Sequence, residues 1–331
     1  MTTRRRLLSL GVAGLIALPR RALGQSNERV WRVGFLWPRS PMEPPLNDYY
    51  DEVPKGLKDL GYVEGRNLVI ERRYAHGNYG RLPELAAELV RLKVDVIVAD
   101  GTTAVQGAQK ATKTIPIVFG SAGDPVGNGL VQSLGRPGGN TTGISLLAGD
   151  SMERKRLEML LSLVPKLTRF AVLYNPSNPF SLVVLKDLDS AARHRKLQLL
   201  RVEARSAAEI EQGFHLMSQQ KADAFVWIAD AVLNQQIRQI AALAAAHRVP
   251  GVGGGRTYAT VGGLLGYGSS QFSNYRRAAA IVDKILRGAN PGEVPVEQPT
   301  NLYLALNRGT ARALGLTIPP ELLLLADEVI E

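Results

Sequence analysis

The feature that most constrains this chain is an alternation of short, almost wholly apolar segments with amphipathic ones. Residues 30–37, 94–99 and 115–119 are apolar runs of strand length. Residues 81–93 carry leucine and alanine at helical spacing, and 102–113 also fits a helix. Strands that are apolar on both faces are typical of a parallel sheet with helices on both sides. The sequence therefore predicts an α/β fold.

The same alternation begins again in the second half of the chain. Residues 137–140 (PGGN) form a turn between the halves. After this turn we predict helices at 152–164 and 275–286 and strands at 170–174, 197–202, 224–229, 262–268 and 302–306. Two such sets in succession predict two doubly wound, parallel-sheet lobes joined by a hinge. Ligands bind at the carboxyl ends of the strands in such sheets, so we expect the site in the cleft between the lobes.

The N-terminus has the layout of a secretory signal. Arg4, Arg5 and Arg6 precede an apolar run at 7–18, and small residues at Ala22 and Gly24 suit cleavage before Gln25. The paired arginines resemble a twin-arginine signal. We therefore predict that residues 1–24 are removed on export to the periplasm. The alternative is an uncleaved helix that anchors the protein, although this run is short for a membrane span.

Composition excludes several classes of protein. The chain has no cysteine, which rules out disulfides, thiolate metal sites and a lipid-modified cysteine. Removal of residues 1–24 leaves 35 basic and 30 acidic residues, so the formal charge falls from +10 to +5. These charges are scattered along the chain, so we expect no nucleic-acid partner. No later segment is apolar for long enough to enter a membrane stably.

Side chains suited to catalysis or metal binding are scarce. The histidines (His76, His194, His215 and His247) have no metal-ligand spacing and no adjacent nucleophile. The motifs Gly-x-Ser-x-Gly and His-Glu-x-x-His are absent. The glycine-rich segment 251–256 lacks the ending of a phosphate-binding loop. We therefore predict no catalytic residue, metal or cofactor, and a protein that is not an enzyme.

Several ordered stretches resemble the tryptophan/tyrosine-type family of substrate-binding proteins from ABC transporters. They are 56–67 (GLKDLGYVEGRN), 81–86 (RLPELA), 116–119 (PIVF), 123–127 (GDPVG), 136–140 (RPGGN), 275–279 (YRRAA), 295–300 (PVEQPT), 313–320 (ALGLTIPP) and 326–330 (ADEVI). The resemblance covers essentially the whole chain after residue 24. It implies a type I periplasmic-binding fold, in which three chain crossings join two lobes that close on a ligand.

The resemblance and the turn residues together predict the limits of the lobes. Lobe 1 would comprise 30–146 and about 258–297, and lobe 2 would comprise 149–256 and about 300–331. The hinges would lie near 145–149, 254–260 and 300.

The implied function is a periplasmic receptor that delivers a small polar or aromatic, amino-acid-like solute to the permease subunits of an ABC importer. Two alternatives stay open, a ligand sensor for a membrane signalling protein and an exported enzyme on the same scaffold.

Candidate ligand-binding residues follow the predicted strands. Thr102, Thr103, Ser121 and Ala122 come at strand ends and helix starts, where hydroxyls and backbone N–H groups suit a carboxylate. Capping of a helix is the alternative role for these four residues. Asp124 also follows a strand, but its position before a proline favours a turn.

The other candidates are charged, amide or aromatic. Asp230 could pair with an ammonium group or cap a helix, and Asn175 could bind the ligand or start a turn. Trp37 and Tyr174 could cover a planar ligand or pack in the core. Arg256 is a candidate for a ligand carboxylate, with a surface role as its alternative.

Overall fold

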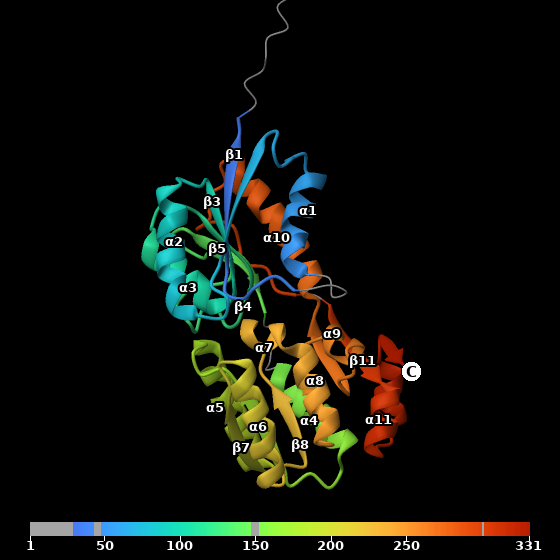
Figure 1. The fold of residues 1–331 in the computed structure, drawn as a ribbon. Helices are drawn as coiled ribbons and strands as arrows, with labels where there is room; N and C mark the ends of the chain where they lie inside the picture. Colours follow the sequence, from blue (N-terminus) through green and yellow to red (C-terminus); the bar gives the residue numbers. More distant parts are fainter. Residues whose placement is uncertain (1–28, 43–47, 147–151, 300) are drawn as a thin grey trace, which may run out of the picture.

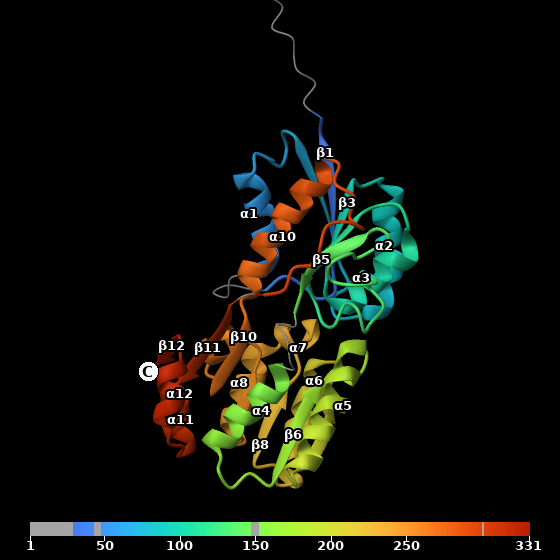
Figure 2. The same ribbon diagram turned by 180° about the vertical axis from the view of Figure 1, so that it is seen from behind.

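The computed structural model describes residues 29–42, 48–146, 152–299 and 301–331 and folds them into two α/β lobes (Figures 1 and 2). The proposed signal at 1–24 and the predicted hinge residue 300 lie outside the described residues. So does most of the predicted hinge at 145–149. Among the described residues, no helix is both long and apolar enough to cross a membrane.

The first lobe is built on a parallel sheet with strand order β2-β1-β3-β4-β5. Its strands are β1 (Trp31–Trp37), β2 (Leu68–Tyr74), β3 (Val96–Asp100), β4 (Ile117–Ala122) and β5 (Thr141–Ser145). Its helices are η1 (Tyr49–Asp51), α1 (Glu52–Asp59), η2 (Tyr79–Arg81), α2 (Leu82–Arg91), α3 (Gly101–Ala111) and α10 (Gln271–Leu286).

Alternate residues of each strand enter opposite cores of this lobe. Val96 and Val98 face α1 and α10, whereas Ile97 and Ala99 face α2 and α3. Both faces are therefore buried, which explains why the β3 segment is apolar throughout.

The second lobe contains a mixed sheet with strand order β12-β11-β10-β9-β8-β6-β7. The strands are β6 (Arg169–Tyr174), β7 (Gln198–Glu203), β8 (Ala224–Trp227), β9 (Gly251–Gly253), β10 (Leu265–Ser269), β11 (Leu302–Asn307) and β12 (Glu328–Ile330). The helices are α4 (Met152–Leu163), α5 (Pro179–His194), α6 (Ala207–Gln219), α7 (Ala231–Gln235), α8 (Ile237–Ala246), α9 (Arg256–Thr260), α11 (Arg308–Leu314) and α12 (Pro320–Leu325). The β10–β11 pair is antiparallel and the other pairs are parallel.

The second crossing between the lobes lies later in the chain than the sequence predicts. We expected a hinge at 254–260 and residues from about 258 onwards in lobe 1. Tyr258 is instead buried in a core of the second lobe, and β10 pairs within the second sheet. The chain returns to the first lobe only at the start of α10, which lies beside α1 in both views (Figures 1 and 2).

Gly143 in β5 occupies a position that tolerates no side chain. A Cβ atom there would lie 2.2 Å from the carbonyl oxygen of Phe119 on β4. We expect Gly143→Ala to lower the free energy of unfolding by about 2–3 kcal/mol, because backbone of a neighbouring strand cannot move aside. Urea denaturation would measure this loss. Gly135→Ala is the matched control, since its Cβ would meet no atom within 4 Å. Equal stability of both variants would contradict this account of β5.

Candidate functional site

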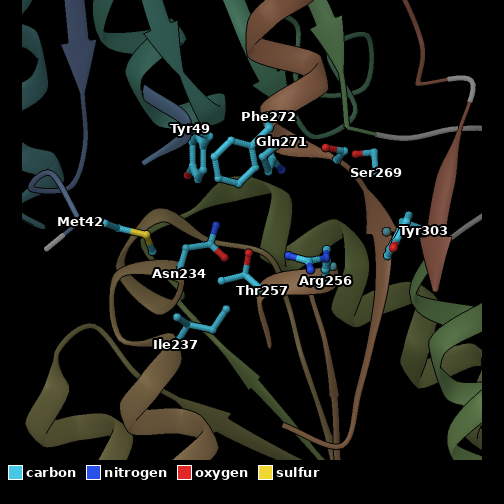
Figure 3. Close-up of a pocket in the computed structure, with 14 residues that line it drawn as sticks. Met42, Tyr49, Asn234, Ile237, Arg256, Thr257, Ser269, Gln271, Phe272 and Tyr303 are labelled. Carbon is cyan, nitrogen blue, oxygen red and sulfur yellow. The ribbon is translucent and has the colours of Figure 1, made fainter. Parts of the chain in front are cut away.

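A cavity of about 220 Å³ lies where the two lobes meet (Figure 3). Tyr49 and Phe272 of the first lobe form its upper wall in Figure 3, with their rings edge to face and centroids 6.3 Å apart. Asn234 and Ile237 of the second lobe lie below them. The remaining lining residues are Met42, Gly254, Gly255, Arg256, Thr257, Gly268, Ser269, Ser270, Gln271 and Tyr303. Apolar and aromatic walls with a few polar groups are typical of a small-molecule site.

A second, smaller cavity of about 40 Å³ adjoins the first and shares Tyr49, Asn234 and Gln271 with it. Its other walls come from the carboxyl ends of strands and from helix starts in both lobes. They are Asp100, Gly101, Thr102, Ser121, Gly123, Leu146, Asn178, Phe180 and Ala229. The two cavities together therefore form one elongated site with a more apolar and a more polar compartment.

The lobes touch directly beside this site. The Tyr79 hydroxyl of the first lobe donates to Asp230 Oδ2 of the second over 2.8 Å. The backbone N–H of Ser40 lies 3.4 Å from Gln235 Oε1. Gly123 packs so tightly on the ring of Phe180 that a Cβ atom would lie 2.3 Å from it. The structure is therefore a closed arrangement of the two lobes.

A buried ion pair supports the aromatic wall. Arg39 donates to both carboxylate oxygens of Asp48, at 2.6 and 3.1 Å, and has no exposed surface. Its guanidinium carbon lies 3.9 Å from the ring centroid of Tyr50 and 4.7 Å from that of Tyr49. Asp48 also accepts from the backbone N–H groups of Met42 and Tyr50. The segment that carries Tyr49 is thereby fixed from both sides by charge-assisted hydrogen bonds and cation–π contacts.

Asp100 places a buried carboxylate in the wall of the smaller cavity. Its oxygens accept hydrogen bonds from the hydroxyls of Tyr50, at 2.7 Å, and Tyr275. Burial raises the pKa of Asp100 above its ordinary value, and the two tyrosine hydrogen bonds oppose this rise. The pKa values of Tyr50 and Tyr275 are also raised, first by burial, so both hydroxyls stay protonated as donors.

Asp230 is a second buried carboxylate, and its bonds are directed at the protein. It caps α7 by accepting from the backbone N–H groups of Val232 and Leu233. Asn175, Asn178 and Tyr79 donate to it as well. Burial raises its pKa and these hydrogen bonds oppose the rise. Asp230 therefore joins the ends of β6 and β8 to the first lobe.

The structure brings three of the predicted residues to the cavities. Thr102 and Ser121 line the smaller one, and Arg256 lines the larger one. The Thr102 hydroxyl donates to the carbonyl of Gly123, and Arg256 forms an ion pair with Glu328. Direct contact of these three residues with a ligand stays a prediction.

The other predicted residues line neither cavity. Trp37 stacks on Tyr50 inside the first core, and Tyr174 and Ala122 are also buried in cores. Asp124 accepts from the N–H of Gly127 in a turn. Asn175 and Asp230 bond each other, and Thr103 is half-buried on α3. Apart from Thr103, each of these residues has a structural role in the described part of the chain: a helix cap, a turn or packing in the core.

Most of the larger cavity consists of residues that sequence reasoning missed. Tyr49 lies on a 3-10 helix whose N-cap is Asp48, and no motif marks it as a wall residue. Gln271 and Phe272 follow the second crossing, so an accurate position for that hinge would have indicated them. Asn234, on α7, lies four residues after Asp230 and carries no separate signal. In the described part of the chain, no group of three or more His, Cys, Asp or Glu side chains could hold a metal ion.

The Arg39–Asp48 pair generates a stability prediction. Arg39→Met would leave the Asp48 carboxylate buried without its cation, so we expect a loss of about 3–5 kcal/mol in the free energy of unfolding. Denaturant titration with circular dichroism would measure it. The control is Arg308→Met, which breaks an exposed pair with Glu331 and should change stability by about 0–1 kcal/mol. If Arg39→Met lowers the free energy of unfolding no more than Arg308→Met does, the buried pair does not stabilise the aromatic wall.

Comparison with known proteins places the chain in a family. A family model described as "ABC transporter substrate binding protein" matches residues 42–330. The tyrosine-binding protein of Clostridioides difficile (strain R20291) is 28% identical over 263 residues, which cover 79% of this chain and 75% of that protein.

Two solved structures extend the likeness. A conserved domain protein from Vibrio cholerae O1 biovar eltor has a TM-score of 0.84 and 28% identity, and the match covers 91% of this chain and 100% of that one. The ABC domain from Streptococcus pneumonia in complex with L-Trp has a TM-score of 0.81 and 25% identity, with the same coverage. This chain therefore belongs to the family of ABC transporter substrate-binding proteins, and its two lobes have the type I periplasmic-binding fold.

Proposed function

We propose that this protein captures an aromatic amino acid in the interlobe cleft and presents its closed form to the permease of an ABC importer. The observation that carries this proposal is the pair of joined cavities enclosed by both lobes. Because its walls come from both lobes, a ligand there stabilises the closed arrangement over the open one.

The larger compartment suits an aromatic side chain. Tyr49 and Phe272 offer aromatic faces and edges, and Met42 and Ile237 add aliphatic surface. Relatives of this chain include a tyrosine-binding protein and a structure in complex with L-Trp. These similarities support a ligand of the same class.

The smaller compartment suits the amino-acid end. The Asp100 carboxylate is positioned as an acceptor for an ammonium group, which would offset the cost of its burial. The Ser121 hydroxyl can donate to a carboxylate, and Gly101 and Thr102 add the backbone N–H groups at the start of α3. Leu146 and Phe180 add apolar surface to the same walls, so water would be displaced as the lobes close.

Binding without chemistry fits the same groups. An exported enzyme would need an acid–base pair in the cleft. Asp100 is perturbed, but its partners are tyrosine hydroxyls whose own pKa values are raised, so neither is suited to lose a proton. We therefore assign a receptor role. The signal-like sequence at 1–24 supports export to the periplasm, by a twin-arginine route and with cleavage near Gln25.

A ligand screen tests this function. Residues 25–331 would be purified, freed of carried-over ligand by unfolding and refolding, and heated with L-tryptophan, L-tyrosine, L-phenylalanine, benzoate or myo-inositol. An aromatic amino acid at one hundred times its Kd should stabilise the fold by about 2.7 kcal/mol, which raises Tm by several degrees. Benzoate and myo-inositol should leave Tm unchanged. Stabilisation by either of these two alone would overturn the proposed ligand class.

The close contact between Gly123 and Phe180 leads to a separate prediction about closure of the lobes. A methyl group at Gly123 would push against the buried ring of Phe180, which belongs to the other lobe. We expect Gly123→Ala to weaken ligand binding by about tenfold or more, because the closed state is disfavoured while each lobe stays folded. Calorimetric titration would measure Kd, and small-angle scattering would report a larger radius of gyration with ligand. Gly135→Ala again serves as control, and unchanged affinity at Gly123 would show that closure does not require this contact.

A further inference from the structure

Two residues with carboxamide side chains, one from each lobe, lie at the junction of the cavities. Gln271 begins α10 of the first lobe, and Asn234 lies on α7 of the second. Both residues line both cavities, and Figure 3 shows them in the wall of the larger one. Any elongated ligand that occupies the two compartments must therefore pass between them.

Neither carboxamide is hydrogen-bonded to the described part of the protein. Gln271 Oε1 is buried and has no partner there. The side chain of Asn234 likewise takes part in no hydrogen bond among the described residues. An acceptor that is withdrawn from water and left unpaired is unfavourable, so a ligand that donates to it gains affinity.

The charged groups of the same walls already have partners. Asp100 accepts from two tyrosines, and Arg256 is paired with Glu328. Gln239 offers an instructive comparison, because its Oε1 is also buried and unpaired, yet its Nε2 is anchored on the carbonyl of Ala207 away from both cavities. Gln271 differs because its carboxamide has no hydrogen bond to the described residues and its residue lines both cavities.

We propose that Gln271 and Asn234 form a clasp that grips the ligand's α-amino group from the two lobes. This inference rests on the proposed function, in which the aromatic body fills the larger compartment and the carboxylate fills the smaller one. The α-amino group of such a ligand sits at the junction between body and carboxylate. One N–H donates to Gln271 Oε1 and another to the Asn234 carboxamide oxygen, and the third points towards Asp100. The clasp makes the amino group a requirement for full closure.

Matched pairs of ligands test the clasp. Calorimetry would compare L-tryptophan with indole-3-propionate, and L-tyrosine with 3-(4-hydroxyphenyl)propionate, which differ only in the amino group. Gln271→Met keeps the length of the side chain and removes the acceptor. We expect it to weaken binding of the amino acids by about tenfold and to leave the deaminated analogues unchanged. Gln239→Met, which removes the comparable carboxamide outside the site, should bind as the wild type does.

A double-mutant cycle tests whether the two carboxamides hold the same group. Asn234→Leu should also cost about tenfold, and the double variant should lose less than the product of the two single losses. Circular dichroism would establish that each variant is folded. Equal weakening of amino acids and deaminated analogues, or no weakening at all, would overturn the clasp while the proposed function stands. Failure of the wild type to bind either amino acid would overturn both.

Discussion

The docking of α10 on the first lobe is the constraint on which the site depends. The chain enters this helix from the second sheet, so the helix ties the two lobes together as it packs. Its fit requires absent side chains: a Cβ at Gly56 would lie 2.6 Å from Ala279, and one at Gly120 would lie 2.6 Å from the Tyr275 ring. Arg276 adds ion pairs to Glu52 and Asp59 on α1. Because α10 packs so closely on the first lobe, its first residues are held at the boundary between the two lobes.

Polar groups behind the aromatic wall continue this docking into the first core. Tyr275 reaches from α10 to Asp100 at the end of β3, and Asp100 also accepts from Tyr50. Tyr50 lies under the Arg39 guanidinium, which in turn holds Asp48. Such a buried network contributes little net stability, because desolvation of the charges offsets their attraction. The network instead fixes geometry. It holds the backbone of residues 48–50 and the start of α3 in one orientation relative to α10.

The sequence predicts the lobes well where burial on both faces dictates composition. The β3 segment and α2 were predicted within a few residues, because apolar runs and helical spacing report directly on the core. The predicted position of the second crossing was wrong, and the reason is also physical. The predicted hinge at 254–260 begins in a glycine-rich segment. In that segment a Cβ at Gly253 would lie 1.6 Å from Trp227 Nε1, and one at Gly251 would meet the Phe225 ring at 2.2 Å. These two glycines make room for aromatic rings in the core. Sequence alone does not distinguish a glycine needed for close packing from one needed for bending.

The position of a residue relative to the strands decides whether the sequence can predict it as a site residue. Thr102 and Ser121 follow apolar strands, and the topology of a parallel sheet places every such residue at the cleft. Tyr49, Asn234 and Gln271 follow no such rule, because they share a wall only when the lobes close. The two groups also differ in what closure changes. Residues at strand ends keep their places whether the cleft is open or shut, so they can receive a ligand first. Residues from opposite lobes come together only after the lobes close. Their contacts with the ligand therefore stabilise the closed state relative to the open state. A receptor that must report occupancy to a membrane partner needs this second group, and it is the group with the weakest signature in the sequence.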